Sequence, residues 1–428
     1  MTSNAVLIKG GHVVDPATGL DGRADIFIKD GRIQTIANDI KTNNNTIVID
    51  ATHKHVIPGL VDCHVHLREP GLEYKETIET GSRAAAKGGY TTLICEPNTI
   101  PPIDSLEMVE AFMELVRQKS LVNIYTKACI TKGLLGEELT DIDKLATDKR
   151  VRALSDDGNP VFYETLIKRA CELASRHKLI ISPHCEDSQI SLDKAKGNSN
   201  VAHFPGKPFC HETDFIIREI NCTEEARGWL HISHVSLKNS LEVIQQAKER
   251  RVAKITCEVT PHHLLLDEHF KNTNGTVPKT NPPLRSREDR EALQESLSNG
   301  VVDVIATDHA PHTHDDIKKG ASGFVGLETA LGVILTKLVH PGMLSLKEVV
   351  RKMSTNPAQI FNVTGGSLAV GMPADIAIID LDKEWTVDVD KFESKARNCP
   401  FNGWKLIGQV VATLVGGRVV VDNCQMVC

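Results

Sequence analysis

Short apolar runs recur through the middle of the chain, and segments with helical periodicity separate them. The apolar runs have the length of β-strands and are Leu60–Asp62, Thr91–Ile94, Asn123–Thr126, Val151–Leu154, Leu179–Ser182, Leu230–Ser233, Ile255–Val259 and Val302–Ala306. The helical segments include Tyr74–Lys87, Ser105–Lys119, Val161–His177, Ser240–Arg250 and Ser286–Ser298. A strand followed by a helix, repeated about eight times, predicts an α/β fold with a parallel sheet, and at this length a closed (β/α)8 TIM-like barrel.

An open, doubly wound sheet is the alternative to the barrel. Such sheets commonly hold a nucleotide on a glycine-rich turn after the first strand. No GxGxxG or P-loop motif follows Leu60–Asp62. The pattern therefore favours a barrel, which we expect to span residues 58–364.

Both ends of the chain have the pattern of β-strands. Ala24–Lys29 and Arg32–Ile36 flank Asp30-Gly31, a strong two-residue hairpin signal. Further strand-like runs occur near the other end, at Ala374–Ile379 and Val410–Val415. Neither piece has enough strands to fold comfortably alone. We expect residues 1–57 and 365–428 to combine into one small β-domain of the sandwich type.

Charge and hydrophobicity exclude several classes of protein. The 428 residues carry a formal net charge of −7, with dispersed Lys and Arg, which argues against a nucleic-acid partner or binding to an anionic membrane. No apolar run approaches the roughly 18 residues of a membrane span. The N-terminal residues lack the apolar core and cleavage site of a signal peptide. We therefore expect a cytoplasmic protein.

The 11 cysteines are scattered along the chain without the paired spacing of a zinc knuckle. Only Cys424 and Cys428 lie close together in the sequence. We expect most of the cysteines to be buried free thiols in a reducing compartment.

The first predicted barrel strand ends in Asp62-Cys63-His64-Val65-His66. Side chains alternate along a strand, so we expect Asp62, His64 and His66 to share one face while Cys63 and Val65 point away. Two imidazoles at positions i and i+2 can converge on one metal ion. Asp62 could orient a histidine or serve a structural role.

Further metal-binding side chains follow later strands. They are Asp156 and Asp157 after the fourth strand, His184 after the fifth, His234 after the sixth and Asp308 after the eighth. The carboxyl ends of barrel strands are where the active sites of this architecture lie. Four histidines with Asp157 and Asp308 suit a two-metal site that favours zinc, with manganese or cobalt as substitutes.

These residues belong to longer motifs that resemble the amidohydrolase superfamily. Pro58–His66 is similar to the superfamily signature. Other blocks resemble the dihydroorotases in particular: Leu67–Gly71, Lys75–Thr77, Glu96–Thr99, Ser155–Gly158, Asn281–Arg285 and Ala306–His312. The blocks occur in order from the first strand to the last, so the resemblance covers essentially the whole chain. It implies a hydrolase with two zinc ions per subunit.

The resemblance also bears on the group that bridges the metals. Hydantoinases, allantoinases and one dihydroorotase class generally use a carboxylated lysine on the fourth strand, and no lysine follows Val151–Leu154. In this respect the chain resembles the dihydroorotase class in which an aspartate bridges the two metals. Spacing to His184 favours Asp157, with Asp156 as the alternative. The chain departs from the family at Ile94-Cys95-Glu96, where a Met-Pro-Asn arrangement is more usual. We expect Glu96 to alter the pocket rim.

The substrate implied by the resemblance is dihydroorotate, formed reversibly from carbamoyl-aspartate in pyrimidine biosynthesis. Asp308 would be the general base that carries a proton from the attacking water to the leaving ring nitrogen. Arg68 lies two residues beyond His66 and offers a fork that fits the substrate carboxylate. The resemblance adds Asn98, Asn281 and His312 as substrate contacts.

Two other functions are compatible with parts of this pattern. Another cyclic amidase, such as a hydantoinase or allantoinase, is disfavoured by the missing lysine and by the set Arg68, Asn98 and Asn281. A non-catalytic homologue that serves as a scaffold for aspartate transcarbamoylase usually loses metal ligands, whereas this chain has a candidate for all six. Homodimers are common among the relatives.

Overall fold

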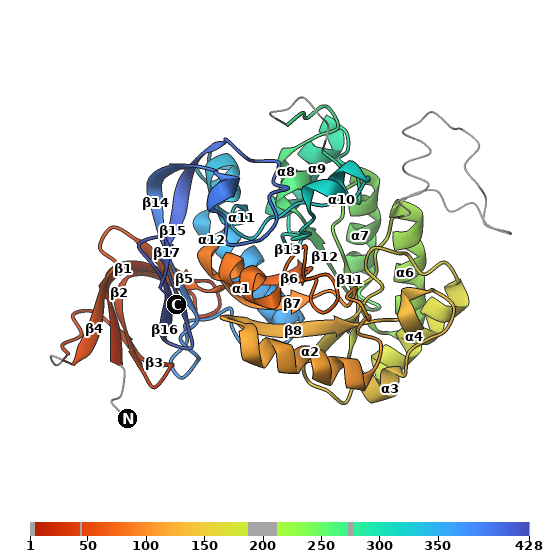
Figure 1. Ribbon diagram of the computed structural model, residues 1–428, viewed down its shortest axis with the longest axis horizontal. Coiled ribbons are helices and arrows are strands. Elements are labelled where there is room, and N and C mark those ends of the chain that lie inside the picture. The colour runs from red at the N-terminus through yellow and green to blue at the C-terminus, as the bar shows by residue number, and fades with distance from the viewer. Residues whose placement is uncertain (1–4, 43–44, 187–211, 273–277, 428) are drawn as a thin grey trace.

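The computed structural model describes residues 5–42, 45–186, 212–272 and 278–427 (Figure 1). Cys210 and Cys428 lie outside these ranges. The other nine cysteines are free thiols, and all of them except Cys399 are buried. Within the described ranges, no helix has the length and apolar character needed to cross a membrane.

Eight parallel strands form the barrel, in the order in which they occur along the chain. They are β6 (Leu60–Val65), β7 (Tyr90–Cys95), β8 (Asn123–Ala128), β9 (Val151–Leu154), β10 (Ile180–Ile181), β11 (Trp229–Ile232), β12 (Lys254–Val259) and β13 (Val304–Ile305). The two edges meet where Val65 pairs with His309, and the amide of His66 donates to the carbonyl of His309 at 2.9 Å. The structure thus confirms the predicted barrel.

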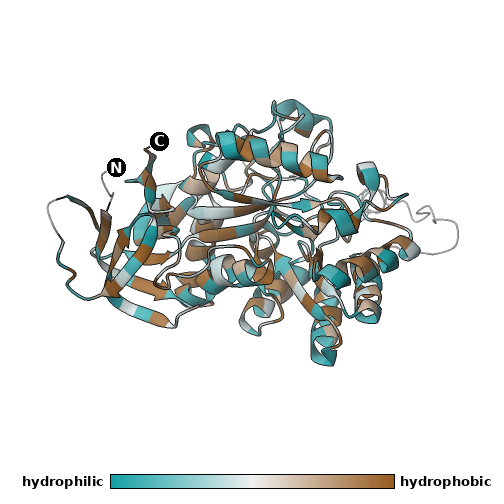
Figure 2. Cartoon of the chain, turned by 90° about the horizontal axis from the view of Figure 1, so that it is seen from below, coloured by the Kyte–Doolittle hydropathy of each residue, from teal (hydrophilic) through white to brown (hydrophobic). Residues whose placement is uncertain are grey.

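Helices follow the strands and surround the barrel (Figure 1). They are α1 (Ile78–Lys87), α2 (Leu106–Lys119), α3 (Ile142–Leu145), α4 (Glu164–His177), α6 (Glu212–Ala226), α7 (Lys238–Arg250), α8 (Pro261–Leu265), α9 (Arg287–Ser298), α10 (His314–Lys318), α11 (Ala330–Ile334), α12 (Leu346–Val350) and α13 (Asn356–Ile360). The longer helices carry both hydrophilic and hydrophobic residues, as the mixed colours of Figure 2 show. Their boundaries follow from caps: the side chains of Ser105 and Ser286 accept from the first turns of α2 and α9.

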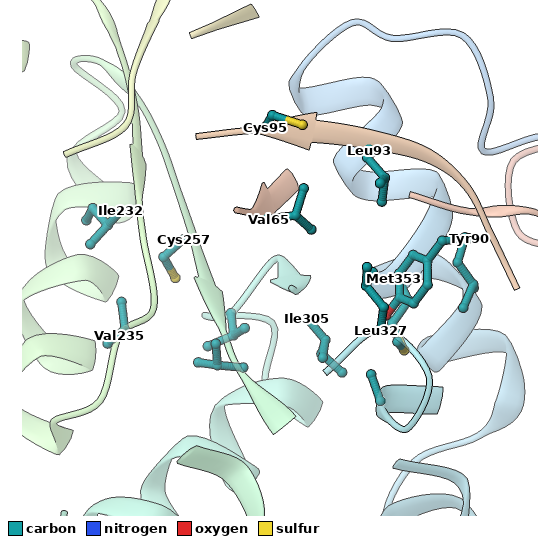
Figure 3. Close-up of a cluster of buried hydrophobic side chains, with 14 of the residues drawn as sticks. Val65, Tyr90, Leu93, Cys95, Ile232, Val235, Cys257, Ile305, Leu327 and Met353 are labelled. Atoms are coloured by element: carbon teal, nitrogen blue, oxygen red, sulfur yellow. The ribbon is translucent and has the colours of Figure 1, made fainter. Parts of the chain in front are cut away.

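Strands β6 and β7 are buried along their entire length, because helices cover one face and the barrel interior covers the other. Side chains such as Val65 and Leu93 pack outward against the surrounding shell, which includes Met353 (Figure 3). A smaller cluster, which includes Val61 and Ile94, forms the apolar part of the interior. The polar groups of the interior lie together with this cluster, as described below.

The strands from the two chain ends share one nine-stranded sheet. They are β1 (Ala5–Asp15), β2 (Leu20–Lys29), β3 (Arg32–Ala37), β4 (Thr46–Asp50), β5 (His55–Pro58), β14 (Ile376–Thr386), β15 (Lys405–Val415), β16 (Arg418–Asp422) and β17 (Gln425–Met426). The N-terminal strands join the C-terminal ones where β5 lies between β1 and β14, at the left of Figure 1. This arrangement confirms a separate β-sheet domain built from both ends.

The passage from this sheet into the barrel packs closely against the side chain of Thr91 in β7. Gly59 separates β5 from β6, and a Cβ atom there would lie 2.1 Å from the hydroxyl of Thr91. Only glycine fits without a shift of β7.

Candidate metal centre

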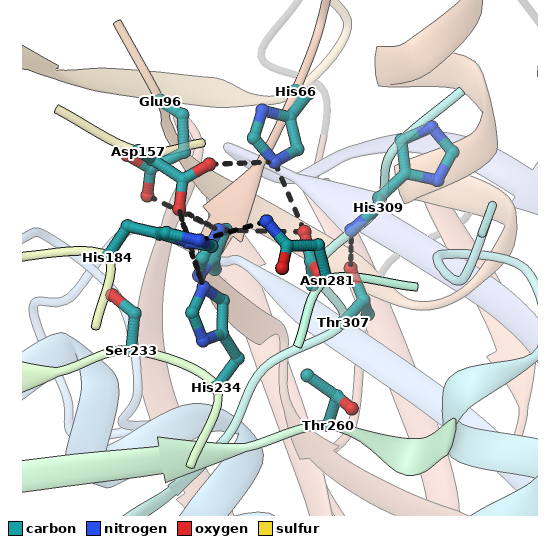
Figure 4. Close-up of polar contacts among 12 residues, drawn as sticks. His66, Glu96, Asp157, His184, Ser233, His234, Thr260, Asn281, Thr307 and His309 are labelled. Atoms are coloured by element: carbon teal, nitrogen blue, oxygen red, sulfur yellow. Dashed lines mark hydrogen bonds and ion pairs between the residues drawn. The ribbon is translucent and has the colours of Figure 1, made fainter. Parts of the chain in front are cut away.

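Asp157 lies at the centre of the histidines that we predicted as metal ligands (Figure 4). Its Oδ1 is 3.4 Å from His64 Nε2, 3.4 Å from His184 Nδ1 and 3.5 Å from His234 Nε2. Its Oδ2 is 3.5 Å from His66 Nε2. One carboxylate therefore faces four imidazoles that come from three different strands of the barrel.

Asp308 completes the cluster from the other side. Its Oδ1 lies 3.1 Å from His66 Nε2 and 3.6 Å from His64 Nε2. The structure thus brings together all six of the predicted ligands. The close groups His64–His66–Asp308 and His64–Asp157–His234 each have donor atoms within 4.8 Å of one another, which suits a shared ion.

The neighbouring Asp156 points elsewhere. Its carboxylate accepts from the amides of Ile130 at 2.7 Å and Thr131 at 3.1 Å, and from the hydroxyl of Thr131. It secures the loop after β8, whereas Asp157 faces the histidines.

The side-chain directions that we predicted for the first strand are wrong in one respect. Cys63 does not point away from the histidines: it packs with Val61 and Ile94 in the interior, and its Sγ donates to Glu258 at 3.0 Å. The pairing of β6 with β7 shifts register between Asp62 and Val65, which breaks the strict alternation of side chains. Asp62 accepts from the amides of His64 and Thr307, so its carboxylate fixes the backbone at these two residues.

Glu258, which the sequence analysis did not single out, orients two of the histidines. Its Oε1 accepts from Nδ1 of His64 at 2.5 Å and from the amide of His234 at 3.2 Å. Donation from Nδ1 leaves Nε2 of His64 as the lone-pair nitrogen that faces the cluster. Its Oε2 lies 3.1 Å from His231 Nε2. The signal that could have identified Glu258 is an acidic residue within the apolar strand β12.

Glu96 does not lie at the pocket rim, where we predicted it. Its side chain has no exposed surface and forms an ion pair with Lys127, whose side chain is equally buried in the barrel interior. Lys127, a lysine within the apolar strand β8, was not predicted to lie near the site.

The histidine cluster opens into a cavity of about 260 Å³ that also contains the predicted substrate contacts. Arg68 is buried, donates from Nε to the carbonyl of Pro311 at 3.2 Å, and places its Nη2 3.3 Å from His312 Nε2. His312 also lies 3.4 Å from Lys75 Nζ. Burial, together with the charges of Arg68 and Lys75, lowers the pKa of His312 to about 3.

The two predicted asparagines contact two histidines of the cluster directly. Oδ1 of Asn98 accepts from Nδ1 of His66 at 3.0 Å, and its Nδ2 donates to the carbonyl of Asp157 at 3.3 Å. Asn281 Nδ2 is 3.0 Å from His184 Nε2. Both residues line the cavity, so they hold histidines and face the same space as Arg68.

The charged groups of the cluster shift the pKa values of one another. Burial alone would lower the pKa of His64, but the surrounding carboxylates, Glu258 first, raise it well above its ordinary value. Burial would likewise raise the pKa of Asp308, but the charge of His64 and the contact with His66 lower it to about 2. The carboxylate of Asp308 therefore stays ionised at neutral pH, the form in which it can bind a cation.

Two buried atoms support the fit of a metal ion. His64 Nε2 and Asp157 Oδ1 both face the cluster, and neither makes a hydrogen bond within the described residues. Buried polar atoms normally have a partner. Imidazole nitrogens and carboxylate oxygens in this proportion match the ligand preferences of zinc.

The comparisons with known proteins agree with this geometry. The amidohydrolase family model matches residues 55–420. A dihydroorotase of Acetivibrio thermocellus is 46% identical over 428 residues, covering 97% of this chain and 99% of the relative. A dihydroorotase of a Thermoanaerobacter species is 45% identical over 421 residues, covering 97% of this chain and 96% of the relative.

Among solved structures, an L-hydantoinase (dihydropyrimidinase) from Arthrobacter aurescens superimposes with a TM-score of 0.88 at 28% identity, covering 99% of this chain and 97% of that one. A D-hydantoinase from a Thermus species has a TM-score of 0.85 at 26% identity, covering 99% and 96%.

Proposed function

Since this chain belongs to the amidohydrolase family, and within it to the dihydroorotases, we propose that it interconverts (S)-dihydroorotate and N-carbamoyl-L-aspartate at a centre of two zinc ions. The observation that carries this proposal is the position of Asp157 between four imidazoles, at 3.4–3.5 Å from each. His64, His66 and Asp308 would hold one ion and His184 and His234 the other, and the carboxylate of Asp157 would be shared by both.

The bound ions would supply Lewis acidity, which lowers the pKa of water and polarises a carbonyl oxygen. The chain's own residues do the rest. In the hydrolytic direction Asp308 takes the proton of the attacking water and passes it to the ring nitrogen as the ring C–N bond breaks. The oxygen of water ends in the new carboxylate, and ring closure runs the same steps backwards.

Arg68 binds the carboxylate that the substrate keeps throughout the reaction. Its guanidinium is held by Pro311 and lies beside His312, so the fork is oriented before the substrate arrives. His312 is neutral at neutral pH because its pKa is about 3, so it adds no charge beside Arg68. It can accept from or donate to the substrate ring.

The similarity to hydantoinase structures favours a second candidate, hydrolysis of another cyclic amide. The purified protein should be assayed with dihydroorotate, carbamoyl-aspartate, hydantoin and allantoin, with metal content measured on the same sample. We expect turnover of the first two substrates and up to two zinc ions per chain. Faster turnover of hydantoin, or a protein that binds no metal, would overturn the proposal.

From the same family resemblance we propose a homodimer and an association with aspartate transcarbamoylase. The nine free cysteines are in keeping with a cytoplasmic location. Analytical ultracentrifugation of the chain, alone and with the transcarbamoylase, tests both assembly proposals: a monomer that does not comigrate with the second enzyme would contradict them.

A further inference from the structure

An ion pair lies inside the barrel beside the histidine cluster. Glu96 directly follows β7, Lys127 belongs to β8, and neither side chain has any exposed surface. Two charges in such a place are costly to desolvate, and a buried ion pair often contributes no more stability than two apolar side chains of the same size. The pair is therefore not explained by fold stability alone.

Lys127 is fixed from three sides. Besides Glu96, it donates to the hydroxyl of Ser182 at 2.9 Å, and Ser182 lies 3.1 Å from the hydroxyl of Ser233. The ammonium group also lies 5.9 Å from the centre of the Phe361 ring. Ser182 and Ser233 stand two and one residues before His184 and His234, so this network is continuous with the strands that carry those ligands.

Glu96 in turn faces His64. Its Oε1 is 3.7 Å from His64 Nε2, the nitrogen that points into the cluster. Oε1 is the oxygen that pairs with Lys127, whereas no hydrogen bond reaches Glu96 Oε2 or His64 Nε2 from the part of the chain that the structure describes. Two donor atoms bound to one zinc ion lie roughly 3–3.6 Å apart, given ligand distances near 2.0–2.2 Å. The separation of Glu96 and His64 is close to that range.

We propose that Glu96 is a further ligand of the ion that His64 binds, with Lys127 holding its carboxylate in place. The inference rests on the metal centre proposed above and deepens it, because it makes the two ion positions unequal. The position of His64, His66 and Asp308 gains a carboxylate, whereas the position of His184 and His234 does not. Zinc should therefore fill the two positions in separate steps, and the site of His64 should bind more tightly.

The central variant is the double substitution Glu96→Met/Lys127→Met, which removes the ligand without leaving an unpaired buried charge. The metal-free protein is titrated with zinc, and cobalt is then used as a spectroscopic probe. We expect the tighter binding step to weaken at least about 10-fold, as the loss of an outer partner of a ligand already does. The visible absorption of the cobalt protein should also change, because one ligand is missing.

A matched control is Arg218→Met/Glu219→Met, which removes another buried ion pair, on helix α6. It should keep both zinc-binding steps and the cobalt spectrum. If the Glu96→Met/Lys127→Met protein also keeps them, Glu96 is not a ligand and the inference fails while the metal centre stands. A wild-type protein that binds neither zinc nor cobalt would overturn the inference and the proposed function together.

The single variant Lys127→Met gives an independent test that does not depend on activity. Without Lys127, the carboxylate of Glu96 is left unpaired in the metal-free protein, and the bound ion becomes its only counter-charge. The melting temperature of the metal-free variant should fall, and zinc should raise it by more than it raises that of the wild type. An equal rise in both proteins would show that the ion does not contact Glu96.

Discussion

Glu258 accepts a hydrogen bond from Nδ1 of His64 at 2.5 Å, in the interior of the barrel. We expect Glu258→Gln to weaken zinc binding about 10- to 100-fold, because the bond fixes both the orientation and the tautomer of a ligand. Zinc affinity of the purified variant, measured by competition with a chelator, checks this. The control Glu328→Gln alters a buried carboxylate that pairs with Lys87, and it should bind zinc like the wild type. Equal affinities of the two variants would contradict the role of Glu258.

Metal reconstitution and the substitution of Asp157 test which kind of group bridges the two metals. A carboxylated lysine forms reversibly from carbon dioxide, whereas a protein carboxylate needs none. Metal-free protein rebuilt with zinc in a buffer free of carbon dioxide should therefore recover the same activity with and without bicarbonate. Asp157→Ala should fail in both buffers.

Asp156→Ala is the matched control. It removes the acceptor for Ile130 and Thr131, so its free energy of unfolding should fall while zinc content is kept. A requirement for bicarbonate would show that Asp157 is not the bridging group. An active Asp157→Ala beside a zinc-free Asp156→Ala would show that Asp156 bridges the metals instead.

Arg68→Met should keep its zinc and lose affinity for dihydroorotate. A charge-assisted hydrogen bond contributes about 1.5–3 kcal/mol, which corresponds to a rise in KM of about 10- to 150-fold. Steady-state kinetics and metal analysis of one preparation give both quantities. Arg83→Met, which removes an arginine that pairs with Glu393, should leave KM unchanged. An unchanged KM in Arg68→Met would remove Arg68 from the carboxylate site.

Two buried histidines should make the fold sensitive to acid. Burial lowers the pKa of His262 to about 4, and burial lowers that of His263 well below its ordinary value. Both are neutral in the folded state, whereas a histidine in the unfolded chain titrates near 6.5. Their stabilising contribution is therefore complete above pH 6.5 and is lost as the pH falls towards 4.

For His262 alone, this loss amounts to about 2 kcal/mol between pH 7 and pH 5. Urea unfolding of the metal-free protein at pH 7, 6 and 5 measures it, and His262→Gln should show a shallower decline than the wild type. The His269 side chain is 84% exposed, so His269→Gln should decline like the wild type. The same slope in all three proteins would show that His262 is not buried in its neutral form.

Much of the fold could be predicted because local signals agree with the tertiary structure. The helix predicted over Ser105–Lys119 begins at Leu106 because Ser105 caps it. The helix predicted from Tyr74 begins only at Ile78, because Thr77 and Thr80 form a capping box there. The places of His184 and His234 in the cluster could be predicted, since both follow short apolar strands whose carboxyl ends meet at one edge of the barrel.

The remaining features of the site depend on contacts between strands. The alternation of side chains along a single strand does not reveal such contacts. Cys63 turned inward because the register of β6 shifts, and a shift has no mark in the sequence. Glu258 and His64 are 194 positions apart and meet only because the barrel closes. Glu96 directly follows β7 and Lys127 lies on the neighbouring β8, but their pairing requires both to face the interior at the same level.

The shared sheet of the two chain ends has a consequence for biosynthesis. During translation β5 leaves the ribosome before any barrel strand, whereas its partner β14 follows the last of them. Until then β5 exposes unpaired backbone groups, which are targets for aggregation and for chaperones. The sheet can be completed only after the entire barrel has been synthesised. A nascent chain that stalls before β14 therefore keeps an open sheet edge, which favours aggregation.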